Sequence, residues 1–197
     1  MCHATHTTPA PQGLASKKIA AGAFFCFSLD VRDHTCYSVC EMKHDMRKSE
    51  RQLGREEAED ILLHGEYGVL STCGADGEPY GTPISYVYAD GAICFHCAPG
   101  VGHKLANIAE NPQVCFTVVG HTQPLPAKFS TIYRSAVAFG IAEALEGDAK
   151  RDALRRLIAK YSPDFTAEGE AYIARAFDRV GVYAIRISRL TAKGRLA

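Results

Sequence analysis

Two Asp-Gly turns constrain the fold of this chain more than any other feature. Asp76-Gly77 and Asp90-Gly91 each place residues that tolerate a positive φ angle where a hairpin reverses. They divide this part of the chain into three expected strands, at residues 67–72, 79–88 and 92–97. We therefore expect an antiparallel meander at the centre of the protein.

The middle strand of this meander has two faces of different bulk, because side chains alternate along a strand. One face carries Tyr80, Thr82, Ile84, Tyr86 and Tyr88, and the other carries Gly81, Pro83, Ser85 and Val87. The second face is low, so a flat ring could lie against it. The alternative is that its small residues only let a neighbouring strand or helix pack closely.

A glycine turn, Gly100-Val101-Gly102, comes directly before an expected helix at residues 103–110. A helix start carries unpaired N–H groups and partial positive charge, so it favours a phosphate or carboxylate. His103 and Lys104 would add charge-assisted donors at this point. The spacing is not that of a P-loop. We interpret the turn and helix as an anion site attached to the sheet.

Six short matches, in order and spacing, resemble a known family. They are Gly68–Thr72, Asp76-Gly77-x-Pro79, Thr82–Tyr86, Phe95–Ala98, Gly102–Lys104 and Asn111-Pro112. The pattern is similar to the FMN-binding split-barrel family related to pyridoxamine 5'-phosphate oxidase. Within it, the chain most resembles the nitroimidazole-resistance (Nim-type) flavin reductases. The resemblance runs from about Met46 to the C-terminus.

The remaining pattern fits the fold that this resemblance implies. Apolar spacing predicts helices at 55–64, 148–161 and 167–177, and strands at 114–119, 130–145 and 180–187. In the second of these strands we expect Val137 and Phe139 to face inward and Gly140 to favour a bulge. A loop at 120–127 should end the strand at 114–119. Residues 46–197 are thus expected to form a mainly β domain with flanking helices (α+β), a six-stranded antiparallel split barrel.

The resemblance also implies a site in which FMN lies at the interface of a homodimer. Backbone groups along one strand would bind the edge of the flavin ring: Thr82, Pro83, Ile84 and Ser85. The next strand would flank the ring or the ribityl chain, with Phe95, His96, Cys97 and Ala98. The phosphate would be held by Gly102, His103 and Lys104.

His96 is the candidate catalytic residue, because Nim-type proteins have a histidine at the matching place. An imidazole titrates near neutral pH and could protonate an acceptor as it is reduced. The alternative is a histidine that only satisfies a neighbouring polar group. Cys97 shows no sign of an activated thiolate, so we do not expect a catalytic cysteine.

These residues predict an FMN-dependent reductase that passes electrons from NAD(P)H to a small acceptor, such as a nitroaromatic. The alternative function is a non-catalytic flavin- or haem-binding module. A phosphorylated B₆ substrate is not expected, because the strand Thr82–Tyr88 carries no cation.

Composition limits the partners. With 22 basic and 22 acidic residues the formal charge is zero, which gives no reason to expect nucleic acid or an anionic membrane. No run approaches the ~18 apolar residues of a membrane span. Cysteines placed inside expected strands, such as Cys94 and Cys97, are typical of a reducing compartment, so we expect a cytoplasmic protein. These two cysteines should face opposite sides of their strand.

Residues 1–45 differ in texture, being rich in Thr, Pro, His, Cys and Ala, and we expect a poorly ordered extension. Lys17-Lys18 and the apolar run 19–29 resemble a secretory signal, but no cleavage site follows. Another reading is that Met46 is the natural start. The set His34, Cys36, Cys40 and His44 lacks zinc-finger spacing, so we expect no metal, with structural zinc as the alternative.

Overall fold

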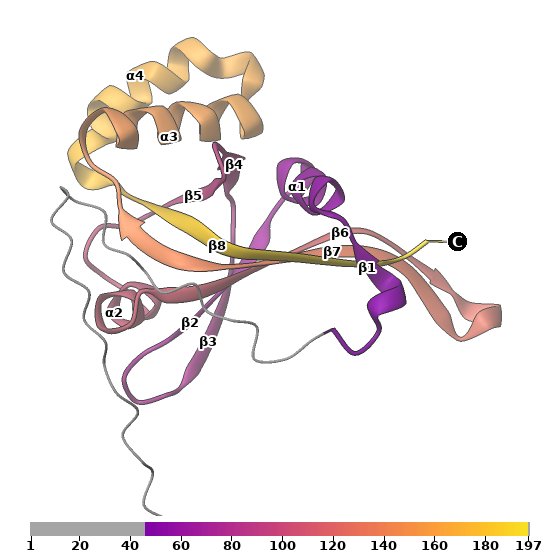
Figure 1. Cartoon of the computed structure of the whole chain (residues 1–197). Helices are drawn as coiled ribbons and strands as arrows, with labels where there is room; N and C mark the ends of the chain where they lie inside the picture. Colours follow the sequence, from indigo (N-terminus) through magenta and orange to yellow (C-terminus); the bar gives the residue numbers. More distant parts are fainter. Residues whose placement is uncertain (1–45, 197) are drawn as a thin grey trace, which may run out of the picture. The chain divides into compact units, whose positions relative to one another are not determined.

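The structure is a computed structural model that describes residues 46–196 of the chain (Figure 1). The expected N-terminal extension and the candidate zinc ligands lie outside these residues. The strands are β1 (Gln52–Leu53), β2 (Gly68–Cys73), β3 (Pro79–Ile84), β4 (Val87–Ala89), β5 (Ala92–Cys97), β6 (Gln113–Leu125), β7 (Ser130–Ala144) and β8 (Gly181–Arg195). The helices are α1 (Arg55–His64), α2 (His103–Glu110), α3 (Gly147–Tyr161) and α4 (Thr166–Ala176). Short 3₁₀ turns are η1 (Ser49–Arg51), η2 (Pro126–Lys128), η3 (Pro163–Phe165) and η4 (Phe177–Arg179).

The described strands form one antiparallel sheet in the order β3-β2-β6-β7-β8-β5-β4, and β1 pairs with β8. The mainly β class with flanking helices is confirmed. The prediction of a closed six-stranded barrel was wrong, because the sheet has eight strands and its two edges, β3 and β4, do not pair. Only Ser85-Tyr86 separates these edges in the chain. The expected strand 79–88 is split there, and its halves pair with β2 and β5 respectively.

The split is maintained by the hydroxyl of Tyr161, at the end of α3. This hydroxyl accepts a hydrogen bond from the backbone N–H of Tyr86 at 2.9 Å. Its own proton lies within reach of two carbonyl oxygens, those of Glu66 at 2.7 Å and Tyr86 at 2.9 Å. The backbone of Tyr86 is therefore satisfied by a helix side chain in place of a neighbouring strand.

Tyr86 itself is fully buried and fixes the same segment to α1. Its hydroxyl donates to the carbonyl oxygen of Leu62 at 2.6 Å. The ammonium of Lys160 lies 4.0 Å from the centre of the Tyr86 ring and donates to the Gly65 carbonyl at 2.7 Å. Burial raises the pKa of the Tyr86 phenol and lowers the pKa of the Lys160 ammonium.

The inner face of the sheet packs against α1 and α2 around one main core. On β7 the inward residues are the small ones, Ala136, Ala138, Gly140 and Ala142. The expectation that Val137 and Phe139 face inward was wrong, since both are half-buried on the other face. Small side chains suit this strand because α1 packs against it, and α1 contributes the buried Ala58 to the same core. A register shift does occur at Gly140, where a Cβ atom would lie 2.2 Å from the Arg186 carbonyl oxygen.

The expected loop at 120–127 is largely strand instead. β6 continues to Leu125 and pairs with β7, after a register shift between Val119 and Thr122. Its pairing with β2 ends at Thr117. Pro124 can therefore sit in the strand, because no second neighbour needs its missing N–H.

Helices α3 and α4 cover the outer side of β4, β5 and the start of β8, over a second core that includes Val87, Leu154 and Val182 (Figure 1). Cys94 packs against this second core and Cys97 belongs to the first, so the two cysteines face opposite sides as expected. No helix among residues 46–196 is long and apolar enough to cross a membrane.

The role of Tyr161 predicts the effect of removing its hydroxyl. Tyr161→Phe leaves the Tyr86 N–H without its partner, and should lower the free energy of unfolding by about 1–3 kcal/mol. Urea denaturation measures this. Tyr67→Phe is the matched control, because Tyr67 is exposed and should change stability by less than about 0.5 kcal/mol. Equal stability of the two variants would contradict the role given to Tyr161.

Candidate functional site

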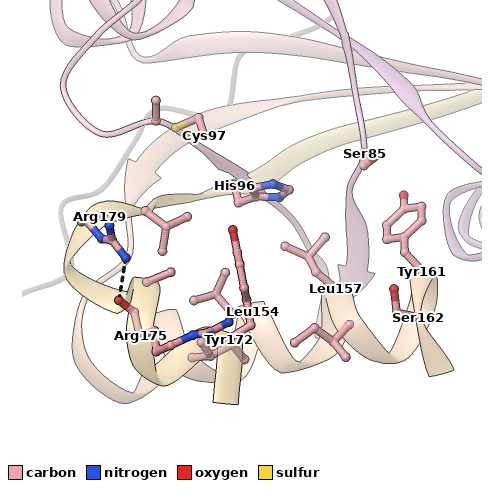
Figure 2. A pocket seen from close by; sticks show the side chains of 15 residues that line it. Ser85, His96, Cys97, Leu154, Leu157, Tyr161, Ser162, Tyr172, Arg175 and Arg179 are labelled. Atoms are coloured by element: carbon pink, nitrogen blue, oxygen red, sulfur yellow. Dashed lines mark hydrogen bonds between the residues drawn. The ribbon is translucent and has the colours of Figure 1, made fainter. Parts of the chain in front are cut away.

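A cavity of about 900 Å³ lies between the sheet and the α3–α4 pair (Figure 2). The sheet contributes Ser85, His96, Cys97 and Ala98 to its lining. The opposite wall includes Leu154, Leu157, Ile158, Tyr161, Ser162, Tyr172, Arg175 and Arg179. Four of the eleven residues predicted for the site therefore meet at one cavity, which adjoins the break between β3 and β4.

His96 is exposed, as are Ser85 and Ala98, whereas Cys97 is buried. His96 lies on β5, where Phe95 and Cys97 face the core, so its side chain is on the cavity side (Figure 2). Burial raises the pKa of the Cys97 thiol, although the nearby Lys104 ammonium opposes this. The thiol therefore stays protonated at neutral pH. Phe95 is 0% exposed and stacks on Tyr183, so its side chain cannot reach a ligand at the surface.

β3 forms one edge of the sheet, and its low face is open. Gly81, Pro83 and the following Ser85 are exposed, whereas Thr82 and Ile84 are half-buried toward the interior. A Cβ atom added at Gly81 would find its nearest neighbour, a Val69 methyl group, at 3.6 Å. Within residues 46–196 the small residues of β3 therefore form an uncovered face, as the first of the two interpretations expected.

The low face continues across the sheet in two cross-strand rows. One row is Pro83, Val69, Thr117, Val137 and Thr191, and the other is Gly81, Ser71, Cys115, Phe139 and Arg189. We call these ten residues the outer rows. All are exposed or half-buried. The Arg189 guanidinium lies 3.8 Å from the Phe139 ring centre, and its Nε is buried without a hydrogen-bond partner in the described part of the chain.

The start of α2 has the features expected of an anion site. Gly102 has a φ of 103°, a value that favours glycine, and no side chain caps the helix. His103 stacks on Tyr80, with ring centres 4.2 Å apart. Tyr80 faces the opposite side of β3 from Gly81, so His103 and the low face lie on different sides of this strand. The structure does not bring the predicted phosphate and ring positions to one face within a single chain.

The lining residues missed from the sequence include Tyr161, Tyr172, Arg175 and Arg179. The sequence showed α3 and α4 only as amphipathic helices, and which strands they cover depends on the split at Ser85-Tyr86. A signal was present in the spacing of Tyr172 and Arg175, since residues at i and i+3 share one helix face; Arg179 follows in η4.

Comparison with known proteins gives the family. A family model described as pyridoxamine 5'-phosphate oxidase matches residues 54–194. The chain belongs to this family. The match includes every strand from β2 to β7, most of β8, and helices α1 to α4.

Two solved structures show the same fold. A candidate 5-nitroimidazole antibiotic resistance protein from Bacteroides thetaiotaomicron is similar with a TM-score of 0.61 and 24% identity, covering 73% of this chain and 86% of that one. The FAD and heme binding protein from Mycobacterium smegmatis is similar with a TM-score of 0.65 and 25% identity, covering 75% and 74%.

A curated relative is an enzyme. The 5a,11a-dehydrotetracycline/5a,11a-dehydrooxytetracycline reductase of Streptomyces rimosus is 32% identical over 82 residues. The matched stretch is 40% of this chain and 55% of that reductase. The chain thus matches about half the length of this relative.

Proposed function

We propose that this protein is an FMN-dependent reductase that transfers electrons from NAD(P)H to a small acceptor. The observation that carries the proposal is the cavity that brings an exposed histidine, His96, together with Ser85, the residue that follows the open edge strand β3. The family supports flavin chemistry, and the similarity to a reductase supports oxidoreduction.

The residues present fit a flavin mononucleotide in three respects. β3 is an edge strand, so backbone groups on its free side at Thr82–Ser85 are open to the polar edge of a ring. The exposed Gly81 and Pro83 leave room for a flat group. The uncapped start of α2, with Lys104 beside it, suits a phosphate.

When bound, the flavin supplies reversible two-electron chemistry, accepting a hydride from a reduced nicotinamide and giving it to an acceptor. The residues of the chain would bind the flavin, orient it and shield it from water. His96 has the position for a general acid, because it lies in the cavity where an acceptor would meet the ring. A nitroaromatic acceptor is in keeping with the resemblance to Nim-type reductases.

A homodimer would complete this site. His103 and the low face lie on different sides of β3 in one chain, so a second copy is the simplest source of the missing wall. The outer rows are a suitable interface, because nine of their ten residues carry no charge and the tenth, Arg189, has an unpaired buried Nε. Sedimentation of the flavin-loaded protein as a monomer would contradict this part of the proposal.

A haem-binding module is the second candidate, favoured by one observation. An exposed histidine faces a cavity that has apolar residues on its far wall, Leu154, Leu157 and Ile158. Imidazole is a common axial ligand of haem iron.

An absorption spectrum followed by anaerobic reduction tests the proposed function. Purified protein reconstituted with FMN should show the two visible bands of oxidised flavin. These should bleach within seconds when NADH or NADPH is added, and return when a nitroaromatic is added. A haem spectrum instead would favour the second candidate. Bound flavin that reduced nicotinamide leaves oxidised would refute the enzyme.

The phosphate assignment predicts the effect of Lys104→Ala. Loss of a charge-assisted contact should weaken FMN binding by about 1.5–3 kcal/mol, which is roughly ten- to a hundredfold in Kd. Fluorescence titration of the flavin-free protein measures this. Lys128→Ala is the control, since it makes the same charge change in η2, outside the predicted site. Equal affinities for the two variants would show that Lys104 does not contact the phosphate.

The general-acid assignment predicts a different result for His96→Gln. Glutamine keeps a polar side chain of similar length but cannot exchange a proton near neutral pH. Turnover with a nitroaromatic should fall by about 10²-fold or more, whereas the FMN content should change little. If flavin content and turnover fall together, His96 has a structural role only.

A further inference from the structure

The helical wall of the cavity carries two arginines, Arg175 and Arg179, that form no salt bridge within the described residues, whereas nearby arginines do. On the same helix pair, Arg155 Nε lies 2.6 Å from Glu170 and Arg156 lies 2.8 Å from Asp90. Within residues 46–196, neither Arg175 nor Arg179 has a carboxylate within 4.0 Å. No acidic residue lines the cavity. The wall therefore presents positive charge that the described chain does not neutralise.

Local contacts keep these cations close to an aromatic ring. Tyr172 is 63% exposed at the cavity, and the Arg175 guanidinium carbon lies 5.9 Å from its ring centre. Arg179 donates to the Arg175 carbonyl oxygen at 3.1 Å. Figure 2 shows Tyr172, Arg175 and Arg179 coming from the helical side, with His96 across the cavity on β5. An aromatic platform and two guanidinium groups thus share one wall.

This combination of side chains favours a ligand that has both a carboxylate and a flat ring. Guanidinium groups bind planar carboxylates through paired N–H donors, and an exposed tyrosine offers a stacking surface for a flat ring. The same wall has an apolar part, with Leu154, Leu157 and Ile158, that would desolvate the body of a ligand. β3 and β4 bring no cation to the cavity, and both guanidinium groups in its lining come from α4 and η4.

We infer that the cavity selects an aromatic acceptor that carries a carboxylate, with Arg175 and Arg179 binding the carboxylate and Tyr172 contacting the ring. This inference rests on the proposed function, because it takes the cavity to be the acceptor site of the reductase. The carboxylate is held at the helical wall, which leaves the other end of the ring directed toward His96. Arg175 and Arg179 are positioning residues for the substrate and take no part in proton transfer.

Binding of a matched ligand pair tests the inference. Equilibrium dialysis at about 0.15 M salt, where exposed charges are largely screened, would compare 4-nitrobenzoate with the neutral 4-nitrobenzamide. It would be done on the FMN-loaded protein and on the flavin-free protein. We expect the carboxylate to bind about tenfold more tightly than the amide, as for a charge-assisted hydrogen bond. Equal affinities would overturn the inference.

Three variants assign the preference to the two arginines. Arg175→Gln and Arg179→Gln should each reduce the preference for the carboxylate, and the double variant should abolish it while the affinity for the amide stays within about twofold. Arg151→Gln is the matched control, because it removes the same charge from α3 at a residue that contacts Phe177 and does not line the cavity. A preference that survives in the double variant would overturn the inference.

Failure of the inference can be told apart from failure of the proposed function. If FMN binds and is reduced by nicotinamide but both ligands bind equally, only the carboxylate selectivity is wrong. If the protein never binds FMN or the flavin never bleaches, the reductase is wrong whatever the dialysis shows. In the kinetic version, the ratio of kcat/KM for the two nitro compounds should fall in the double variant, with kcat for the amide unchanged.

Discussion

The arrangement of the whole site depends on one hydroxyl group. The Tyr161 hydroxyl bonds the backbone of Tyr86, at the point where β3 would otherwise continue into β4. This contact ends β3 as an edge strand and at the same time ties α3 to the sheet. The same contact has two effects. The helices are placed against β4 and β5, and the edge of β3 stays open, so a cavity is left between the helices and the sheet.

Chemical roles are divided between the two sides of that break. The sheet side offers backbone groups, a low surface and the helix start of α2, all of which suit a cofactor with a flat ring and a phosphate. The helical side offers Tyr172, Arg175 and Arg179, which suit a substrate.

Much of the fold could be predicted from local signals. The Asp-Gly turns gave the hairpins, the apolar spacing gave α1, α3 and α4 to within a residue or so, and the glycine turn before His103 gave α2. The errors came where a helix distant in sequence determines the structure of a strand. The split at Ser85-Tyr86 depends on Tyr161, 75 residues away in sequence, and no local pattern contains it. The inward face of β7 depends on the close approach of α1. Small residues allow this approach, but their presence in the sequence does not predict it.

The candidate site was predictable in part for the same reason. Ser85, His96, Cys97 and Ala98, which the family resemblance implied, do line the cavity. The opposing helical wall, and the opposite facing of His103 and Gly81, could not be found without tertiary structure.

The two prolines of β3 have a consequence for how the protein behaves when concentrated. Pro79 and Pro83 both lie in an edge strand and neither has an N–H group. A strand from another molecule could not form a continuous ladder along this border, so amyloid-like stacking through it is discouraged. A small-molecule ligand needs only one or two polar contacts with the backbone of this edge strand. The same border can therefore remain open to a small molecule while resisting the growth of fibrils.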